Sequence, residues 1–541
     1  MIKERILNDL KKVVEEINYP PTDPLLYTPE NNSFGDYSTN IALQLSKLKS
    51  GNSKHSPVEI ARKILDNLEG LDYIEKVEIA GPGFINFFIK PELLAEQVGE
   101  ILEKGDGFGK NEFGKGEKVQ VEFISANPTG PLTLANGRGG AIGDSLANVL
   151  AWNGYQVERE YYVNDTGNQI RLLGESVLAA VGKIEAKEEH YKGEYVKELA
   201  ERPLSSESPQ ELGHKLADYL LESEIKPAAE RLGIKFDEFY SERSLYERGL
   251  IQKAADVLKE KGYAYEKDGA LWFASEKFGD EKDRVLLTSE EGRGRREPTY
   301  FLADIAHHFD VLQRGYYKKI TILGADHHGY ETRLKGAVSA LGYDGHVDLI
   351  FMQMVKLFRG GEEVRMSKRA GNFVTLNELL DQVSPDVARF FFLLFSPQSH
   401  INFNLDLAKE QSEKNPVYYV QYAHARMANI LNKKEGSQGV ALSTQGVALN
   451  KLSHSSELAL IKHLVQFPDL VEEIAKDYQV HRLTFYSTKL SDLFHKFYES
   501  CRVINAESEE LKDARLALVS AAKITLGNTL NLLGIEAPER M

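Results

Sequence analysis

The chain has 541 residues, of which 42% are hydrophobic and 27% charged, a balance typical of a soluble globular protein with several domains. Its one cysteine, Cys501, excludes a disulfide framework and a cysteine-based zinc site, and it favours a reducing cytoplasm. The formal net charge of −15 argues against general coating of nucleic acid but leaves room for a basic groove that serves one RNA. No apolar run has the length expected of a bilayer span, so we expect no membrane contact.

The first 115 residues predict a small α+β domain. Residues 2–17 carry apolar side chains at helical spacing with charges between them, which predicts an amphipathic helix and not a signal peptide. Residues 33–47 predict a turn followed by a second helix. Residues 77–89 predict two strands, separated at Gly81-Pro82-Gly83. A run rich in glycine and lysine, residues 103–118, then marks a domain boundary.

Residues 116–385 alternate between predicted strands and helices, which favours a Rossmann-like domain with a mostly parallel sheet. The clearest candidate strands are residues 119–124, 158–163 and 319–326. Residues 175–295 are charged and predict a largely helical insertion. Residues 386–541 predict an all-α domain, in which 435–450 reads as a loop that contains QGVAL twice. We assign no function to that loop.

The loop NPTGPLTLANGRGG, residues 127–140, lies between a predicted strand and a predicted helix. It lacks the Gly-x4-Gly-Lys-Ser/Thr pattern of a P-loop. Gly137 and Gly139 fit a dinucleotide fingerprint, but the last position is Ile142, so that match fails. The loop still predicts a helix N-terminus with outward backbone N–H groups, where phosphate could bind. Alternatively, its glycines only allow the helix to pack closely on the sheet.

A second glycine-bounded stretch, GGEEVRMSKRAGNFVTL, covers residues 360–376. Mobile cations in such a stretch, here Lys368 and Arg369, could close over phosphates and stabilise developing negative charge. The alternative is an ordinary solvated charged loop.

Polar residues near the ends of predicted strands and helices form a third candidate set: Glu122, Asn127, Asn164, Asp165, Gln169, Tyr300 and Asp304. They could bind a cation, or they could simply cap helices and cover the surface. The pairs His307-His308 and His327-His328 suggest a metal, but further ligands at zinc-like spacing are missing, so we predict no protein-bound metal.

Five long stretches in order resemble arginyl-tRNA synthetase, a class I aminoacyl-tRNA synthetase family, and the resemblance covers essentially the whole chain. They are SFGDYSTNIALQL; SANPTGPL with GRGGAIGDSLANVLAWNGYQVEREYYVNDTGNQI; TYFLADIAHHFD with ITILGADHHGYETRLKGAVSALGY; VRMSKRAGNFVTL; and NPVYYVQYAHARMANIL with LGIEAPERM. The fourth is similar to the Lys-Met-Ser-Lys-Ser signature of the class. The resemblance implies a small N-terminal tRNA-contacting domain (1–115), a catalytic domain (116–385) and a helical anticodon-binding domain (386–541).

The resemblance further implies that the chain activates arginine with ATP and transfers it to its tRNA. Such catalysis is mainly positioning and electrostatic stabilisation, because protein groups do little covalent work. The residues expected to contact ATP or the reacting phosphates are Lys368, Arg369, Met366, Ser367, Thr133, Asn136, Gly137, Gly139 and Gly140. Those expected near arginine are Glu242, Tyr300 and Asp304 at its side chain and Glu122, Ser125, Asn127, Gln169 and His327 at its backbone groups. A carboxylate pairs bidentately with guanidinium, so this pocket discriminates without an editing site.

One stretch departs from the family. Its first signature is His-x-Gly-His, and here those positions read Thr133-Leu134-Ala135-Asn136. Thr133 keeps a hydroxyl and Asn136 an amide donor, but neither can carry positive charge. We therefore hold three alternatives: an active enzyme in which these residues substitute for the histidines, a tRNA-binding homologue that has lost activation, and a nucleotidyltransferase of the same fold that charges no tRNA. We favour the first.

For partners, the resemblance implies arginine tRNA, L-arginine and ATP, with Mg²⁺ arriving as part of the ATP substrate. Tyr418, Tyr422 and Arg426 are candidates for stacking on, or phosphate contact with, unpaired anticodon bases, although tyrosines at helical spacing are also core residues. We expect a cytoplasmic monomer. Relatives commonly need tRNA before they activate arginine, and the resemblance implies this here too.

Overall fold

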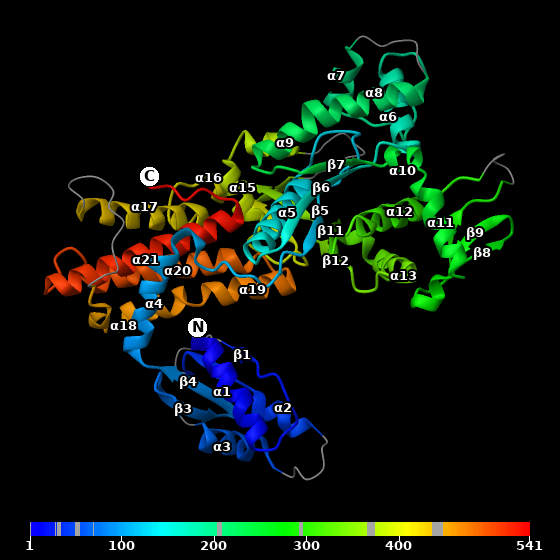
Figure 1. The fold of residues 1–541 in the computed structure, drawn as a ribbon. Helices are drawn as coiled ribbons and strands as arrows, with labels where there is room; N and C mark the ends of the chain where they lie inside the picture. Colours follow the sequence, from blue (N-terminus) through cyan, green and yellow to red (C-terminus); the bar gives the residue numbers. More distant parts are fainter. Residues whose placement is uncertain are drawn as a thin grey trace.

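The computed structural model describes residues 2–27, 29, 34–48, 55–68, 70–202, 208–290, 296–364, 374–434 and 447–541, without the side chains of 326–328, 433 and 434. Figure 1 shows a small N-terminal body, a central α/β body and a helical bundle beside it. The multidomain α/β architecture predicted from the sequence is confirmed.

The N-terminal body packs three helices against a four-stranded antiparallel sheet. The helices are α1 (Ile2–Glu16), α2 (Ile41–Lys47) and α3 (Pro57–Asn67); the strands are β1 (Leu26–Tyr27), β2 (Tyr37–Thr39), β3 (Ile74–Ala80) and β4 (Phe84–Ile89), in the order β1-β2-β4-β3. The predicted amphipathic helix and the two strands that flank Gly81–Gly83 are confirmed. Buried Ile6, Leu10 and Val13 lie on the inner face of α1.

Helix α4 (Pro91–Lys104) connects this body to the rest of the chain (Figure 1). It packs against α18 (Ser455–Leu464) and α21 (Glu509–Leu533). The predicted domain boundary near residue 115 therefore falls after a helix that already contacts the C-terminal bundle.

The central sheet is parallel throughout and has the order β12-β11-β5-β6-β7. Its strands are β5 (Lys118–Glu122), β6 (Gln156–Val163), β7 (Glu238–Ser241), β11 (Lys318–Gly324) and β12 (Val347–Met352). The sheet separates helix α5 (Leu134–Trp152) from helix α12 (Tyr300–Gln313). Because neighbouring residues of a strand point to opposite faces, Arg159 reaches Asp144 on α5 while Glu160 reaches His307 on α12.

The predicted helical insertion is only partly helical. Its helices are α6 (Gly167–Ala180), α7 (Glu194–Ala200), α8 (Pro209–Leu220), the π-helical segment Leu221–Ile225, α9 (Lys226–Arg231), α10 (Arg243–Glu247) and α11 (Leu250–Glu260). The same range also supplies β7, and an antiparallel sheet of β8 (Ala264–Lys267), β9 (Ala270–Phe273) and β10 (Arg284–Leu287). Four-residue strands are too short to show a period, which explains why the sequence did not predict them.

Beyond the second half of the central sheet lie α13 (Glu331–Leu341), β13 (Val355–Arg359), β14 (Glu362–Val364), α14 (Leu376–Leu380), α15 (Pro385–Phe392), β15 (Ile401–Asn404) and α16 (Leu405–Lys409). Strand β15 pairs in parallel with β13, so the predicted all-α region contains one strand. The bundle itself comprises α17 (Pro416–Lys434), α18, α19 (Phe467–Asp477), α20 (Arg482–Ser500) and α21. Of the predicted loop 435–450, residues 435–446 lie outside the described residues.

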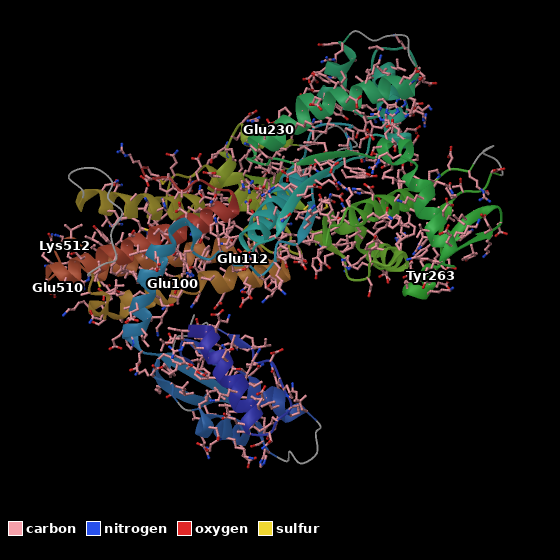
Figure 2. All side chains as sticks on the ribbon, viewed as in Figure 1. Glu100, Glu112, Glu230, Tyr263, Glu510 and Lys512 are labelled. Carbon is pink, nitrogen blue, oxygen red and sulfur yellow. The ribbon has the colours of Figure 1, made fainter. Side chains whose placement is uncertain are left out.

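Helix α21 is the one described helix that is long and apolar enough, by length and composition alone, to cross a membrane, which the sequence did not lead us to expect. In the fold, 72% of its apolar window is buried, and it packs against α17, α20 and α4. Its first turn, with Glu510 and Lys512, lies at the end of the bundle remote from the central sheet (Figure 2). The helix thus forms the core of the bundle.

Candidate active site

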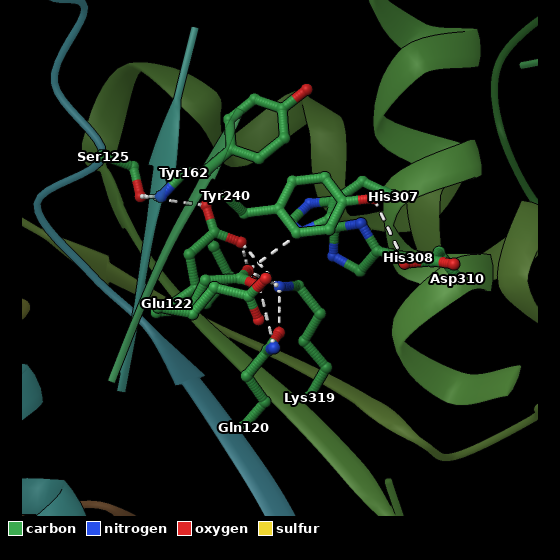
Figure 3. A network of polar contacts seen from close by, with 12 residues as sticks. Gln120, Glu122, Ser125, Tyr162, Tyr240, His307, His308, Asp310 and Lys319 are labelled. Atoms are coloured by element: carbon green, nitrogen blue, oxygen red, sulfur yellow. Dashed lines mark hydrogen bonds and ion pairs between the residues drawn. The ribbon is translucent and has the colours of Figure 1, made fainter. Parts of the chain in front are cut away.

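Six polar residues on the three middle strands face the same side of the central sheet. The register places Gln120 beside Glu158, Glu122 beside both Glu160 and Thr321, and Lys319 beside Gln120. Parallel strands covered on both faces are usually apolar, so a polar band across three of them is unusual. The band lies under α12 and leads to the carboxyl ends of the strands, where α/β sheets bind ligands (Figure 3).

Glu122 ends β5 and is fixed by the turn that follows it. Ile124 and Ser125 have φ angles of 67° and 39°, in the left-handed region that costs energy for residues with side chains. This turn brings the Ser125 hydroxyl back to donate to Glu122 Oε1 at 3.1 Å, while the backbone N–H of Tyr162 donates to Ser125 Oγ at 3.1 Å. The buried carboxylate of Glu122 therefore has a fixed orientation at the strand end.

Glu242 follows β7 and is buried. The hydroxyl of Tyr162 donates to its Oε2 at 3.0 Å, and the hydroxyl of Thr166 donates to its Oε1 at 2.5 Å. Burial raises the pKa of the Glu242 carboxyl, and the two hydroxyls partly oppose that rise. Within the described parts of the chain, Glu242 has no ion pair.

Asp304 lies one helical turn after Tyr300 on α12 and accepts a hydrogen bond from the hydroxyl of Tyr330. Burial, together with the charges of Glu122 and Glu242, raises the pKa of the Asp304 carboxyl to about 7. None of the residues that the structure describes forms an ion pair with it. Tyr300 is 59% exposed, so it lies at the entrance and not in the interior.

The remaining residues predicted near arginine lie at the rim of the same region. The side-chain amide of Asn127 donates to Gln169 Oε1, which links the loop after β5 to the start of α6. The side chain of His327 lies outside the described residues, so its position stays a prediction. Asp165, a strand-end candidate, accepts from Ser241 Oγ at 2.6 Å and from the backbone of Arg243 at 3.0 Å, which fixes the β7–α10 connection.

The TLAN stretch forms the N-terminus of α5, with Thr133 as its N-cap. The Thr133 hydroxyl accepts from the backbone N–H of Asn136 at 3.4 Å, and Asn136 Oδ1 accepts from the backbone N–H of Thr133 at 2.9 Å and from its hydroxyl at 2.8 Å. This reciprocal pair is a capping box. The two side chains are therefore not independent donors: the Thr133 hydroxyl is used, and the amide of Asn136 is the donor that remains.

Gly137, Gly139 and Gly140 are buried, and a Cβ atom at each would meet side chains of the core. The closest neighbours would be Leu376 at 2.8 Å, Met352 at 3.1 Å and Ile234 at 2.6 Å. These distances support the packing alternative for the three glycines. A nucleotide contact by their backbone stays a prediction.

The residues that follow the second signature contact the residues at the start of α5. Thr133 forms an isolated antiparallel bridge with Thr375, and the backbone N–H of Leu376 donates to the carbonyl oxygen of Leu132 at 2.8 Å. Met366, Ser367, Lys368 and Arg369 lie outside the described residues, so their roles stay predictions. The bridge nevertheless ties the segment just after them to the start of α5.

His307, on α12, lies against the polar band. Its Nε2 lies 2.9 Å from Glu160 Oε1, and its ring stacks between those of Tyr162 and Tyr240, at 4.5 and 4.6 Å between ring centres. Glu122, Glu160 and His307 could geometrically hold a cation. The Lys319 ammonium already lies 2.9 Å from each of the two carboxylates, so a positive charge is present at that place.

On the bundle, Tyr418 and Tyr422 lie one turn apart on α17 with parallel rings, 6.5 Å between centres, and Tyr422 is 42% exposed. The Arg426 guanidinium lies 4.7 Å above the ring of Tyr498. The neighbouring Tyr419 instead donates to Asp492 at 2.8 Å and supports the bundle. The exposed pair could stack on bases; its contact with RNA stays a prediction.

Five residues that lie beside the candidate carboxylates were not predicted from the sequence: Tyr162, Thr166, Tyr330, Glu160 and Lys319. A signal existed for the last two. VQVEF places polar residues at alternate positions of an apolar strand, and VEREYY and KKITIL carry consecutive charged residues within the strand, which is unexpected for strands buried on both faces. The tyrosines and Thr166 carry no such signal, because only the fold brings them to the carboxylates.

Comparisons with known proteins agree with this geometry. Three family models match the chain: the arginyl-tRNA synthetase N-terminal domain over residues 1–89, the catalytic domain of class I tRNA synthetases (R) over 97–389 and the DALR anticodon-binding domain over 420–541. The arginine–tRNA ligase of Carboxydothermus hydrogenoformans is 46% identical, covering 95% of this chain and 94% of that protein. That of Bacillus subtilis is 43% identical, covering 100% and 98%.

Among solved structures, Thermus thermophilus arginyl-tRNA synthetase matches with a TM-score of 0.82 at 23% identity, over 100% of both chains. Plasmodium falciparum arginyl-tRNA synthetase matches with a TM-score of 0.76 at 19% identity, over 100% of this chain and 99% of that one. At these identities the structural matches establish the shared fold.

Proposed function

Since the chain belongs to the arginyl-tRNA synthetase family and is an arginine–tRNA ligase, we propose that Glu242 and Asp304 bind the guanidinium of arginine. The observation that carries this proposal is the pair of carboxylates at the strand ends, both of which have hydroxyl partners and no ion pair within the described residues. A guanidinium is planar, always charged and able to make paired hydrogen bonds, so it fits two such carboxylates better than lysine does. Tyr300 covers the entrance.

At the other end of the amino acid, Glu122 pairs with the α-ammonium, and Ser125, Asn127, Gln169 and His327 surround the backbone groups. The fixed orientation of Glu122, set by Ser125 and the strained turn, supports this assignment. The substrate carboxylate is then free to attack the α-phosphorus of ATP. An amino acid with an uncharged side chain would bind poorly in this assignment, because it would leave buried carboxylates unpaired.

ATP, as its Mg²⁺ complex, binds beside the start of α5. Asn136 donates through its side-chain amide, and Lys368 and Arg369, with Met366 and Ser367 in the same stretch, neutralise the pyrophosphate side. The backbone at Gly137, Gly139 and Gly140 completes the cradle. The bridge between Thr133 and Thr375 supports the proposal, because it joins the segment that follows the second signature to the start of α5.

The bundle reads the tRNA through Tyr418, Tyr422 and Arg426, and the enzyme acts as a cytoplasmic monomer. The match to an anticodon-binding domain disfavours a nucleotidyltransferase that charges no tRNA. A tRNA-binding homologue without activation is disfavoured by the intact carboxylate pocket.

The test is arginine-dependent ATP–pyrophosphate exchange, with and without arginine tRNA, on the unaltered protein and on Glu242→Gln and Asp304→Asn. We expect robust exchange by the unaltered protein and, in each variant, an arginine KM raised by about tenfold or more, since a hydrogen bond to a charged group is lost. Exchange that is no faster than in a Lys368→Ala variant would refute the activating role.

A further inference from the structure

The Lys319 side chain is fully buried in the middle of the central sheet, and its three N–H donors all find acceptors. They go to Gln120 Oε1 at 2.6 Å, Glu122 Oε2 at 2.9 Å and Glu160 Oε1 at 2.9 Å (Figure 3). A buried lysine is rare unless paired, and here each proton of the ammonium is used. Although burial alone would lower the pKa of the Lys319 ammonium, Glu122 and Glu160 raise it above its ordinary value.

The two carboxylates that share this ammonium differ in their other partners. Glu160 is fully buried and also meets His307 Nε2 at 2.9 Å, Arg314 at 3.8 Å and the Gln120 amide at 2.9 Å. Burial would raise the pKa of the Glu160 carboxyl, but Lys319 and His307 together hold that pKa below its ordinary value. Besides Lys319, the partners of Glu122 among the described residues are two neutral hydroxyls, from Ser125 at 3.1 Å and Thr321 at 3.4 Å.

We propose that Lys319 is a positioning residue for arginine activation, which holds the Glu122 carboxylate in the orientation that faces the α-ammonium of the substrate. The inference rests on the proposed role of Glu122. Lys319 touches no substrate atom itself and acts through the carboxylate. It engages Oε2, and Ser125 engages Oε1, so the carboxylate plane cannot rotate.

Removing the Lys319 ammonium would change the protonation of one of the two carboxylates that it pairs with. Two buried carboxylates without their shared cation cannot both stay charged, so one of them takes up a proton. Glu160 retains the Arg314 guanidinium at 3.8 Å and the Gln120 amide at 2.9 Å, whereas among the described residues Glu122 retains hydroxyls only. Glu122 therefore becomes the neutral acid, and the site loses its attraction for the α-ammonium.

The experiment compares Lys319→Met with Glu122→Gln and with the unaltered protein. Lys318→Met is the matched control. The Lys318 ammonium belongs to the same strand as Lys319 but pairs with Asp348, at 2.7 Å. The arginine KM and kcat come from ATP–pyrophosphate exchange in the presence of arginine tRNA. The second readout is the inhibition constant of argininic acid, the analogue in which a hydroxyl replaces the α-ammonium.

We expect Lys319→Met to raise the arginine KM about tenfold or more with a smaller change in kcat, and to leave inhibition by argininic acid unchanged. A purely structural role would weaken both ligands alike. Because Lys319→Met leaves buried charge uncompensated and could fail to fold, Lys319→Met with Glu160→Gln serves as a second variant. We expect it to recover thermal stability but not the preference for arginine over argininic acid, because the buried Glu122 still lacks a cation at Oε2.

The outcomes separate the inference from the proposed function. If Glu122→Gln lowers the preference for arginine and the folded Lys319 variants do not, the inference is overturned and the role of Glu122 stands. If Glu122→Gln leaves the preference unchanged, the role of Glu122 is wrong and the inference falls with it. Loss of the preference in Glu122→Gln and both Lys319 variants, with Lys318→Met unaffected, supports both.

Discussion

The side-chain oxygen of Asn136 accepts hydrogen bonds from both the backbone N–H and the hydroxyl of Thr133, at 2.9 and 2.8 Å. The two residues that stand where the family has histidines are thus joined to each other at the start of α5. Helix capping and the proposed phosphate contact fall to different groups of the pair. Thr133 stabilises the helix start, and the amide of Asn136, which takes no part in the capping box, is the group that we propose to contact phosphate.

Asn136→Asp tests that separation. The carboxylate retains the acceptor of the capping box and suits the positive end of the helix, so the melting temperature should not fall. The amide donor is lost and a negative charge replaces it, so kcat for pyrophosphate exchange should drop about 100-fold or more. Asn136→Gln, which keeps an amide, is the control. An Asn136→Asp variant with unaltered kcat would mean that this position gives nothing to the phosphates.

Arginine binding should depend on pH through Asp304, the pKa of which is raised to about 7 by burial and by Glu122 and Glu242. Below that pH the free site holds a neutral acid and attracts a guanidinium less, so kcat/KM for arginine should fall as the pH drops from 8 to 6. Asp304→Asn should flatten this dependence. A profile of the unaltered enzyme that is level through this range contradicts the assignment.

The same carboxyl affects stability with the opposite sign. Its pKa in the folded protein lies above the ordinary value of 3.8, so the folded state binds the proton more tightly than the unfolded state does. The contribution of Asp304 to stability is therefore greatest below pH 3.8 and is lost as the pH rises toward 7. Arginine should offset this loss, so the rise in melting temperature on adding arginine should be larger at pH 8 than at pH 6.

The anticodon surface can be tested apart from the active site. Tyr422→Ala removes an exposed ring that stacks on Tyr418, and stacking on a base contributes about 1–3 kcal/mol. We expect the KM for tRNA in charging to rise about fivefold or more. Tyr265→Ala, which removes an exposed ring from β8 far from the bundle, is the control. Equal effects of the two variants on tRNA KM would rule out the stacking role.

The sequence predicted elements better than it predicted connections between them. Of the five parallel strands, the sequence predicted β5, β6 and β11 but not β7 and β12, and it predicted the helix after the TLAN loop. Glu122 and Asp304 were named from their places near element ends and from the resemblance, and Glu242 from the resemblance alone; the roles of all three stay predictions. The capping role of Thr133 was visible in principle, since Thr-x-x-Asn at a helix start is close to a capping box. Tyr330 could not be found, because it reaches Asp304 only through the packing of the segment after β11.

The C-terminal helix α21 ends beside helix α5, and the side chain of Arg389 contacts both helices. This arginine is 1% exposed; it donates to Asp144 at 2.6 Å and to the carbonyl oxygens of Leu533 at 2.9 Å and Leu232 at 3.2 Å. Removing one partner of a buried ion pair typically costs about 3–5 kcal/mol. Because Arg159 also pairs with Asp144, we expect Arg389→Met to cost an amount at the lower end of this range.

The control is Arg231→Met, which breaks an exposed pair with Asp381 and should cost less than about 1 kcal/mol. The free energies of unfolding come from urea denaturation at neutral pH. Similar losses in the two variants would mean that the buried pair adds no more than a surface pair.

A triple variant, Thr133→His with Ala135→Gly and Asn136→His, would introduce the family's His-x-Gly-His pattern. The change removes both halves of the capping box and puts glycine into the first turn of a helix, each of which typically costs about 1 kcal/mol. We therefore expect a lower melting temperature and pyrophosphate exchange no faster than that of the unaltered protein, because the surrounding residues suit Thr133 and Asn136. Exchange that is detectable only in the restored variant would show that TLAN has lost its chemistry and that the unaltered chain binds tRNA for another purpose.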